Sequence, residues 1–219
     1  RTTSIDGMSE RLRRMVNKPI TRAVLLDFLG AMLRYQGKPH QIKIYSIVGY
    51  PTETEADWHE IVDVIGQADR DSALIDRPWS IVLHCTPFRA MPATPMACEP
   101  MSYRNYRGEI GRVLGAGLKG NLIYQGRNLW AVESMGTESL PTVILSAICH
   151  RGSSADTDAI MRVSRSRKFW SASTAVRVAT LERYFDVDTL FGRFSPETLP
   201  SRYLRTYAKV EKLWGKPFK

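Results

Sequence analysis

The stretch Gln41–Trp58, QIKIYSIVGYPTETEADW, decides the fold of the N-terminal part of the chain. Apolar and polar residues alternate over Gln41–Val48, which predicts a strand, and the Gly-Tyr-Pro sequence at 49–51 predicts the turn that ends it. Thr52 and Thr54 are candidate N-cap residues of the next helix, because a hydroxyl accepts hydrogen bonds from the free N–H groups of a first helical turn. The stretch therefore predicts a strand–turn–helix unit.

Strand–turn–helix units build parallel α/β folds, and in α/β barrels the turn after each strand faces the active site. We therefore expect residues 49–54 to contribute to a functional site. The following helix carries an apolar stripe at Trp58, Ile61, Val62 and Ile65. The acids before and within its first turn are predicted to stabilise the helix N-terminus: Glu53, Glu55 and Asp57.

Similar patterns occur on both sides of this unit. They predict the end of a strand at 2–5, helices at 9–17 and 21–35, and a strand at 78–88. Residues 89–101, rich in Pro and Met, predict a loop. Beyond them the pattern predicts mostly helices, at 103–114, 140–150, 157–167 and 171–183, with a strand at 121–130.

The composition is that of a globular protein, with 219 residues of which 43% are hydrophobic and 24% charged. No apolar run approaches the roughly 20 residues of a membrane helix, and the first residues do not form a signal peptide, so we expect no membrane segment. Three widely spaced cysteines are typical of a reducing cytoplasm. Because the chain opens without methionine, we expect it to be part of a longer product.

Positive charge gathers at the C-terminal end. The net charge is +9, and from Arg162 onward 13 Lys and Arg face 5 acids, which accounts for +8. Aromatic residues lie among these cations, as in Lys168-Phe169-Trp170. Cations with stacking rings suit a nucleic-acid surface, so RNA is a candidate partner. The alternative is a solvated helical tail whose aromatic residues pack on the preceding domain.

Three segments resemble radical S-adenosylmethionine (SAM) enzymes. Residues 6–19, DGMSERLRRMVNKP, resemble the turn and helix after the fourth barrel strand of that family. Ile44–Trp58 is similar to its fifth strand and the Pro-containing turn that follows, although Thr52 stands where the family has glycine. Residues 92–95, PATP, resemble the loop after the sixth strand in the methylthiotransferase and cobalamin-binding branches.

The resemblance implies a fold and a reaction. Residues 1–118 would be the C-terminal half of a partial (β/α)6 TIM-like barrel, and residues 119–219 a mostly helical, basic extension. The activity would be radical-based group transfer, such as methylation or thiomethylation. A cobalamin-binding domain, if used, would precede the segment that binds the iron–sulfur cluster.

The family binds a [4Fe–4S] cluster through a Cys-x-x-x-Cys-x-x-Cys loop, and cleavage of SAM yields a 5′-deoxyadenosyl radical. Cys85, Cys98 and Cys149 are too far apart in the sequence to replace that loop. The resemblance therefore implies that a missing N-terminal half or a second subunit holds the cluster, and that this chain is not competent alone.

The resemblance also implies which residues contact SAM: Asp6, Ser9, Ile47, Gly49, Pro87 and Phe88. Asp6 and Ser9 would meet the ribose and carboxylate, with Asp6 in place of the usual glutamate. Ile47 and Gly49 would flank the adenine, and the absence of a Cβ at Gly49 would let the backbone approach a flat ring.

Other residues and functions remain open. His84 and Cys85 resemble a metal or catalytic pair, but adjacent strand residues face opposite sides, so core packing is the simpler interpretation. Cys98 is interpreted as a plain loop thiol or, as in some relatives, a methyl carrier. The alternatives to an enzyme half are a non-catalytic half-barrel that binds RNA or a protein, and one subunit of a split enzyme.

Overall fold

The computed structural model describes residues 2–35, 40–71, 79–91, 94–101, 129–136 and 139–192. These residues form two compact units: residues 2–86 with 129–136, and residues 87–101 with 139–192. The predicted boundary at 118/119 and the predicted helix at 103–114 lie outside the described residues, as does most of the predicted strand at 121–130.

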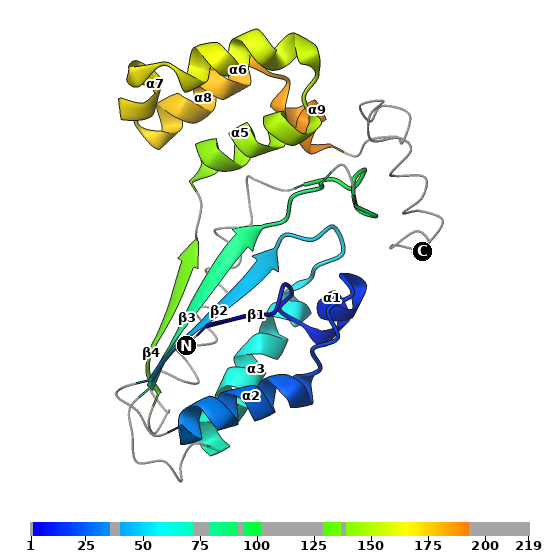
Figure 1. Cartoon of the computed structure of the whole chain (residues 1–219), viewed down its shortest axis with the longest axis vertical. Helices are drawn as coiled ribbons and strands as arrows, with labels where there is room; N and C mark the ends of the chain where they lie inside the picture. Colours follow the sequence, from blue (N-terminus) through cyan, green and yellow to red (C-terminus); the bar gives the residue numbers. More distant parts are fainter. Residues whose placement is uncertain are drawn as a thin grey trace. The chain divides into compact units, whose positions relative to one another are not determined.

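The first unit is an α/β structure (Figure 1). Its elements are β1 (Thr2–Ser4), α1 (Glu10–Met15), α2 (Arg22–Arg34), β2 (His40–Val48), α3 (Glu55–Asp71), β3 (Trp79–Pro87) and β4 (Leu129–Gly136). The four strands form one sheet in the order β1-β2-β3-β4. β1 pairs with β2 in parallel, with Thr3 opposite Ile44, and β3 pairs with β4 in parallel, with Ile81 opposite Val132. An α/β fold on a parallel sheet is therefore confirmed.

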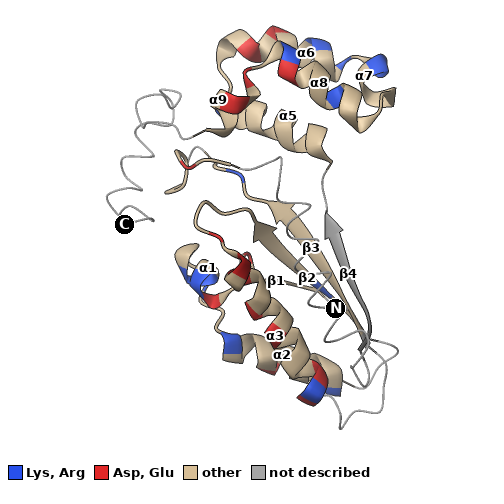
Figure 2. Ribbon diagram, turned by 180° about the vertical axis from the view of Figure 1, so that it is seen from behind, with Lys and Arg blue, Asp and Glu red and all other residues tan. Residues whose placement is uncertain are grey.

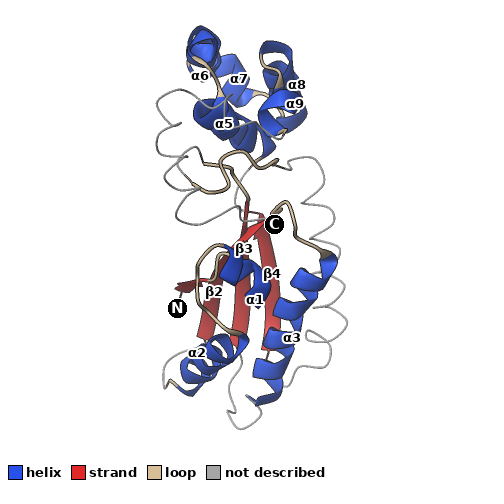
Figure 3. Ribbon diagram, turned by 90° about the vertical axis from the view of Figure 1, so that its right-hand side faces the viewer, coloured by secondary structure: helices blue, strands red, loops and turns tan. Residues whose placement is uncertain are grey.

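Two helices cover one face of this sheet, as Figure 3 shows for α2 and α3. Alternate residues of β2 and β3 enter the core beneath them: Ile42, Ile44, Val48, Ile81, Leu83 and Cys85. The stripe predicted on α3 is buried against them, with Ile61 and Ile65 fully inaccessible to solvent. These side chains and those of α2 form a single hydrophobic core. Burying one such side chain stabilises the fold by about 1.5–3 kcal/mol.

The second unit is helical. It contains α5 (Leu140–Arg151), the 3-10 turn η3 (Ser154–Asp156), α6 (Thr157–Ser164), α7 (Arg167–Ser171), α8 (Thr174–Tyr184) and α9 (Val187–Phe191). The prediction of one helix over 157–167 was wrong at its end, because Ser166 leaves the helix and its hydroxyl accepts a hydrogen bond from the N–H of Phe169. Ser173 caps α8 in the same way.

Arg151 joins three parts of the helical unit. Its side chain is buried, and the guanidinium donates to the carbonyls of Leu190 at 3.0 Å, Gly192 at 2.9 Å and Ala97 at 2.9 Å, and to that of Glu99. Burial lowers the pKa of Arg151 to about 10, which leaves it charged at neutral pH. Arg151 therefore ties the loop at 94–101 to the end of α9.

Arg151→Met should lower the free energy of unfolding of the helical unit by about 3–5 kcal/mol, because it leaves buried carbonyls without donors. Urea denaturation followed by helical circular dichroism measures this. Arg183→Met, at an exposed position of α8, is the matched control. Equal stability of the two variants would contradict the role assigned to Arg151.

Candidate functional site

The turns after β1 and β2 lie at the same edge of the sheet, because parallel strands end on the same side. The phenol of Tyr50 joins them by donating to the carbonyl oxygen of Asp6 at 2.6 Å. Tyr50 is buried, and burial raises its pKa, which keeps the hydroxyl protonated as a donor. The structure therefore brings the two predicted site turns together.

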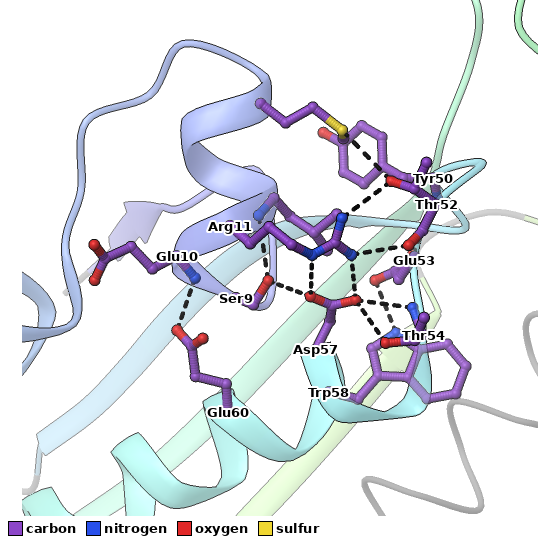
Figure 4. A network of polar contacts seen from close by, with 12 residues as sticks. Ser9, Glu10, Arg11, Tyr50, Thr52, Glu53, Thr54, Asp57, Trp58 and Glu60 are labelled. Carbon is purple, nitrogen blue, oxygen red and sulfur yellow. Dashed lines mark hydrogen bonds and ion pairs between the residues drawn. The ribbon is translucent and has the colours of Figure 1, made fainter. Parts of the chain in front are cut away.

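A buried carboxylate, Asp57, connects α1 to the start of α3 (Figure 4). Arg11 binds both its oxygens, at 3.2 Å from Nε and 2.6 Å from the terminal nitrogen. Ser9 donates to it at 2.5 Å, and Thr54 donates from its N–H at 2.8 Å and its hydroxyl at 3.0 Å. Burial alone would raise the pKa of Asp57, but these hydrogen bonds outweigh it and hold the pKa below its ordinary value.

Arg11 also reaches the turn itself. Its guanidinium donates to the hydroxyl of Thr52 at 3.2 Å and to the carbonyl of Thr52 at 2.8 Å. Thr52 is one of the two predicted N-cap residues, but α3 begins at Glu55 and Thr54 precedes it. Thr52 is therefore an anchor point for α1 in the turn.

The carboxylate of Glu53 holds the turn after β2 together by hydrogen bonds. One carboxylate oxygen accepts from the N–H groups of Gly49 and Tyr50, the latter at 3.0 Å, and the other from the indole of Trp58 at 2.8 Å. Gly49 has φ 81°, a left-handed conformation that favours glycine. Burial raises the pKa of Glu53 to about 7, against the hydrogen bonds that favour the charged form.

Asp6 lies in the opposite turn, also with a positive φ, 54°. Its carboxylate accepts from Lys18 at 2.5 Å and from Ser4 at 2.5 Å. The side chain is about one third exposed, at 35%, so it is accessible to a ligand that could compete with Lys18.

Four of the six residues that the resemblance implied lie in the first unit: Asp6, Ser9, Ile47 and Gly49. Ser9 is 3% exposed, and its hydroxyl is shared between Asp57 and the N–H of Leu12. In this structure Ser9 caps α1. Pro87, the last residue of β3, marks the start of the second unit, which also contains the buried Phe88. The contacts of all six with SAM stay predictions.

The sheet face opposite the core carries a feature that the sequence patterns did not predict. Tyr45 of β2 stacks on His84 of β3 with ring centroids 4.4 Å apart and an interplanar angle of 10°. Cys85 packs in the core instead, so the two neighbours do face opposite sides. Among the described residues, nothing forms a hydrogen bond with the buried Nε2 of His84. The alternation of Lys43, Tyr45 and Ile47 is the signal that could have predicted a second, more polar face.

The cysteines do not fit an iron–sulfur cluster, which needs three thiolates converging on one cubane. None of the three forms a disulfide: Cys85 is buried in the first unit, and the second unit holds Cys98, which is buried, and Cys149, which is exposed. Among the described residues, no group of three His, Cys, Asp or Glu side chains could hold a metal ion.

No protein-family model, curated protein or solved structure matches this chain. In the part of the chain that the structure describes, no helix combines the length and the apolar character needed to cross a bilayer.

Glu53 should make stability depend on pH. Its folded pKa, about 7, lies above the ordinary value of 4.5, so the folded state takes up a proton. The stabilisation of the folded state that comes from this proton is complete below pH 4.5 and is lost as the pH rises through 7. From pH 5 to pH 8 the unfolding free energy of the wild type should fall by about 1–3 kcal/mol relative to Glu53→Gln. Urea denaturation at both pH values measures this, and a pH-independent difference would contradict it.

Asp57→Asn should lower the free energy of unfolding by about 2–4 kcal/mol, because an amide cannot accept the paired hydrogen bonds of Arg11 on both oxygens. Glu55→Gln is the matched control, since Glu55 is exposed in the same helical turn and has an ion pair with His59 only if that residue is protonated. Thermal denaturation compares the two variants. If they lose the same stability, Asp57 does not have the role described.

Proposed function

We propose that this chain is the C-terminal portion of a radical SAM enzyme and supplies the adenosine-side wall of the SAM site. The observation that carries the proposal is the joined pair of turns at the carboxyl edge of the sheet, with Gly49 in a left-handed conformation. In open parallel α/β sheets, ligands bind at this edge.

The turn after β2 suits a flat ligand. Glu53 holds the N–H groups of Gly49 and Tyr50, so the backbone is fixed independently of any ligand. A missing Cβ at Gly49 leaves room for a ring beside the backbone. Asp6, about one third exposed in the neighbouring turn, offers a carboxylate to hydroxyl or amino groups.

The second face of the sheet supports a more specific fold, in which this chain is the C-terminal half of a partial (β/α)6 barrel. Parallel sheets are usually covered on both faces. Here α2 and α3 cover one face, and the other carries the Tyr45–His84 stack. Polar and aromatic side chains are suited to the interior wall of a barrel that admits a substrate.

The proposed reaction is radical-based group transfer, such as methylation. When bound, SAM and a reduced [4Fe–4S] cluster that donates one electron to it would together supply the radical that starts this chemistry. Because the three cysteines do not fit a cluster, the cluster would be held by a preceding segment or a second subunit. Cobalamin would be held there too if the enzyme uses it.

The first test is iron and sulfide analysis of the native product, purified without oxygen and with any subunit that co-purifies. We expect about four irons per chain, as in one [4Fe–4S] cluster. A native product of 24.8 kDa that has no iron and no iron-containing partner would overturn the proposal.

The second test is SAM affinity in that preparation. Gly49→Asn should weaken SAM binding at least about tenfold while preserving the fold, because asparagine tolerates a positive φ but adds a side chain. Isothermal titration measures the affinity. Gly30→Ala, within α2, is the control and should bind normally. Normal binding by Gly49→Asn would exclude Gly49 from the site.

A further inference from the structure

Positive charge is segregated within the second unit. Residues 159–181 contain five cations and no acid, whereas the acids of residues 139–192 lie at η3 and the start of α6, at the end of α8, and around α9. Figure 2 shows Lys and Arg on α6 and α7 and acids at α9. Four of the five cations are exposed: Arg162, Arg165, Arg167 and Lys168.

The four exposed cations lie outside the ion pairs that the described residues form with one another. No carboxylate among the described residues forms an ion pair with them, whereas the ion pairs found all lie within residues 6–60. Like charges so close in sequence repel one another, which costs stability unless an anion compensates them. This part of the unit is therefore complementary to a polyanion.

An exposed tryptophan stands among the cations. The indole of Trp170 is 48% exposed, yet its Nε1 donates to the carbonyl of Ser164 at 2.8 Å. Its ring meets the buried Phe169 edge-on, with centroids 5.1 Å apart and an interplanar angle of 83°. The ring is thus held in position while much of its surface stays accessible, which is the requirement for a stacking platform.

We propose that this surface binds single-stranded nucleic acid; we define the α6–α7 basic surface as Arg162, Arg165, Arg167, Lys168 and Trp170. The cations neutralise phosphates and the indole stacks on one unpaired base. In a duplex the bases are paired and stacked on one another, so no base is available to stack on the indole of Trp170. The proposal is independent of the proposed SAM chemistry.

A membrane surface fits less well. Insertion into lipid needs a continuous apolar helix face, and the apolar side of these helices is turned inward, with Val163, Phe169 and Leu181 buried. The exposed apolar side chains nearby are scattered: Met161, Trp170 and Val176.

The test uses the full chain and fluorescein-labelled 12-nucleotide oligouridylate and oligodeoxythymidylate, followed by fluorescence anisotropy from 50 to 300 mM NaCl. Trp170→Ala should weaken binding about fivefold to hundredfold, and Trp170→Phe, which keeps a ring, should stay within about threefold of wild type. The double variant Arg165→Gln, Arg167→Gln should reduce the slope of log affinity against log salt by about 1.4. Preference for one oligonucleotide would tell RNA from DNA.

Two matched double variants remove the same charge elsewhere: Arg34→Gln with Arg70→Gln in the first unit, and Lys212→Gln with Lys216→Gln near the C-terminus. Both should bind nearly as tightly as wild type. Circular dichroism of all variants verifies that they remain folded.

Three outcomes would overturn the proposal. One is the absence of saturable binding to either oligonucleotide. Another is an equal loss of affinity in the control variants, which would assign binding to overall charge or to the C-terminal residues. The third is tighter binding to an RNA duplex or to phosphatidylcholine–phosphatidylserine vesicles than to the single strands.

Discussion

The carboxylate of Asp57 holds the carboxyl edge of the sheet in one arrangement. Its two oxygens accept hydrogen bonds from α1, through Ser9 and Arg11, and from the residue before α3, Thr54. A buried charge is tolerated only when it is paired and hydrogen-bonded, so the loss of one donor weakens the whole group. The start of both helices and the turn between β2 and α3 therefore depend on one side chain.

Local patterns predicted most elements of the first unit because each is determined by nearby residues. Ser9 and Thr21 cap the helices predicted at 9–17 and 21–35, and the stripe from Trp58 to Ile65 faces the core. The end of the predicted helix at 157–167 was wrong because Ser166 caps a separate short helix, α7, and the pattern of apolar residues does not reveal this cap. β4 spans Leu129–Gly136, later in the sequence than the strand predicted at 121–130. Its position is determined by pairing with β3, a contact between segments distant in sequence.

The candidate site was only partly predictable for the same reason. Asp57 does stabilise the N-terminus of α3 as predicted, through Thr54, but its bonds to Ser9 and Arg11 span 48 and 46 residues. Glu53 was assigned the same helix-capping role, yet it binds the N–H groups of Gly49 and Tyr50. No short-range pattern distinguishes these two acids, because the distinction arises from the packing of two turns against each other.

The turn after β2 is more constrained than a connection between a strand and a helix requires. A glycine and an N-cap residue would be sufficient to reverse the chain. This turn instead buries Glu53 at the cost of a raised pKa, holds Gly49 at φ 81° and uses Tyr50 to bind the neighbouring turn. Buried acids and left-handed residues are maintained against their cost mainly where a backbone shape must be fixed for a ligand. This excess of constraint is the reason for proposing a ligand site at this edge of the sheet, with the core beneath it as the support.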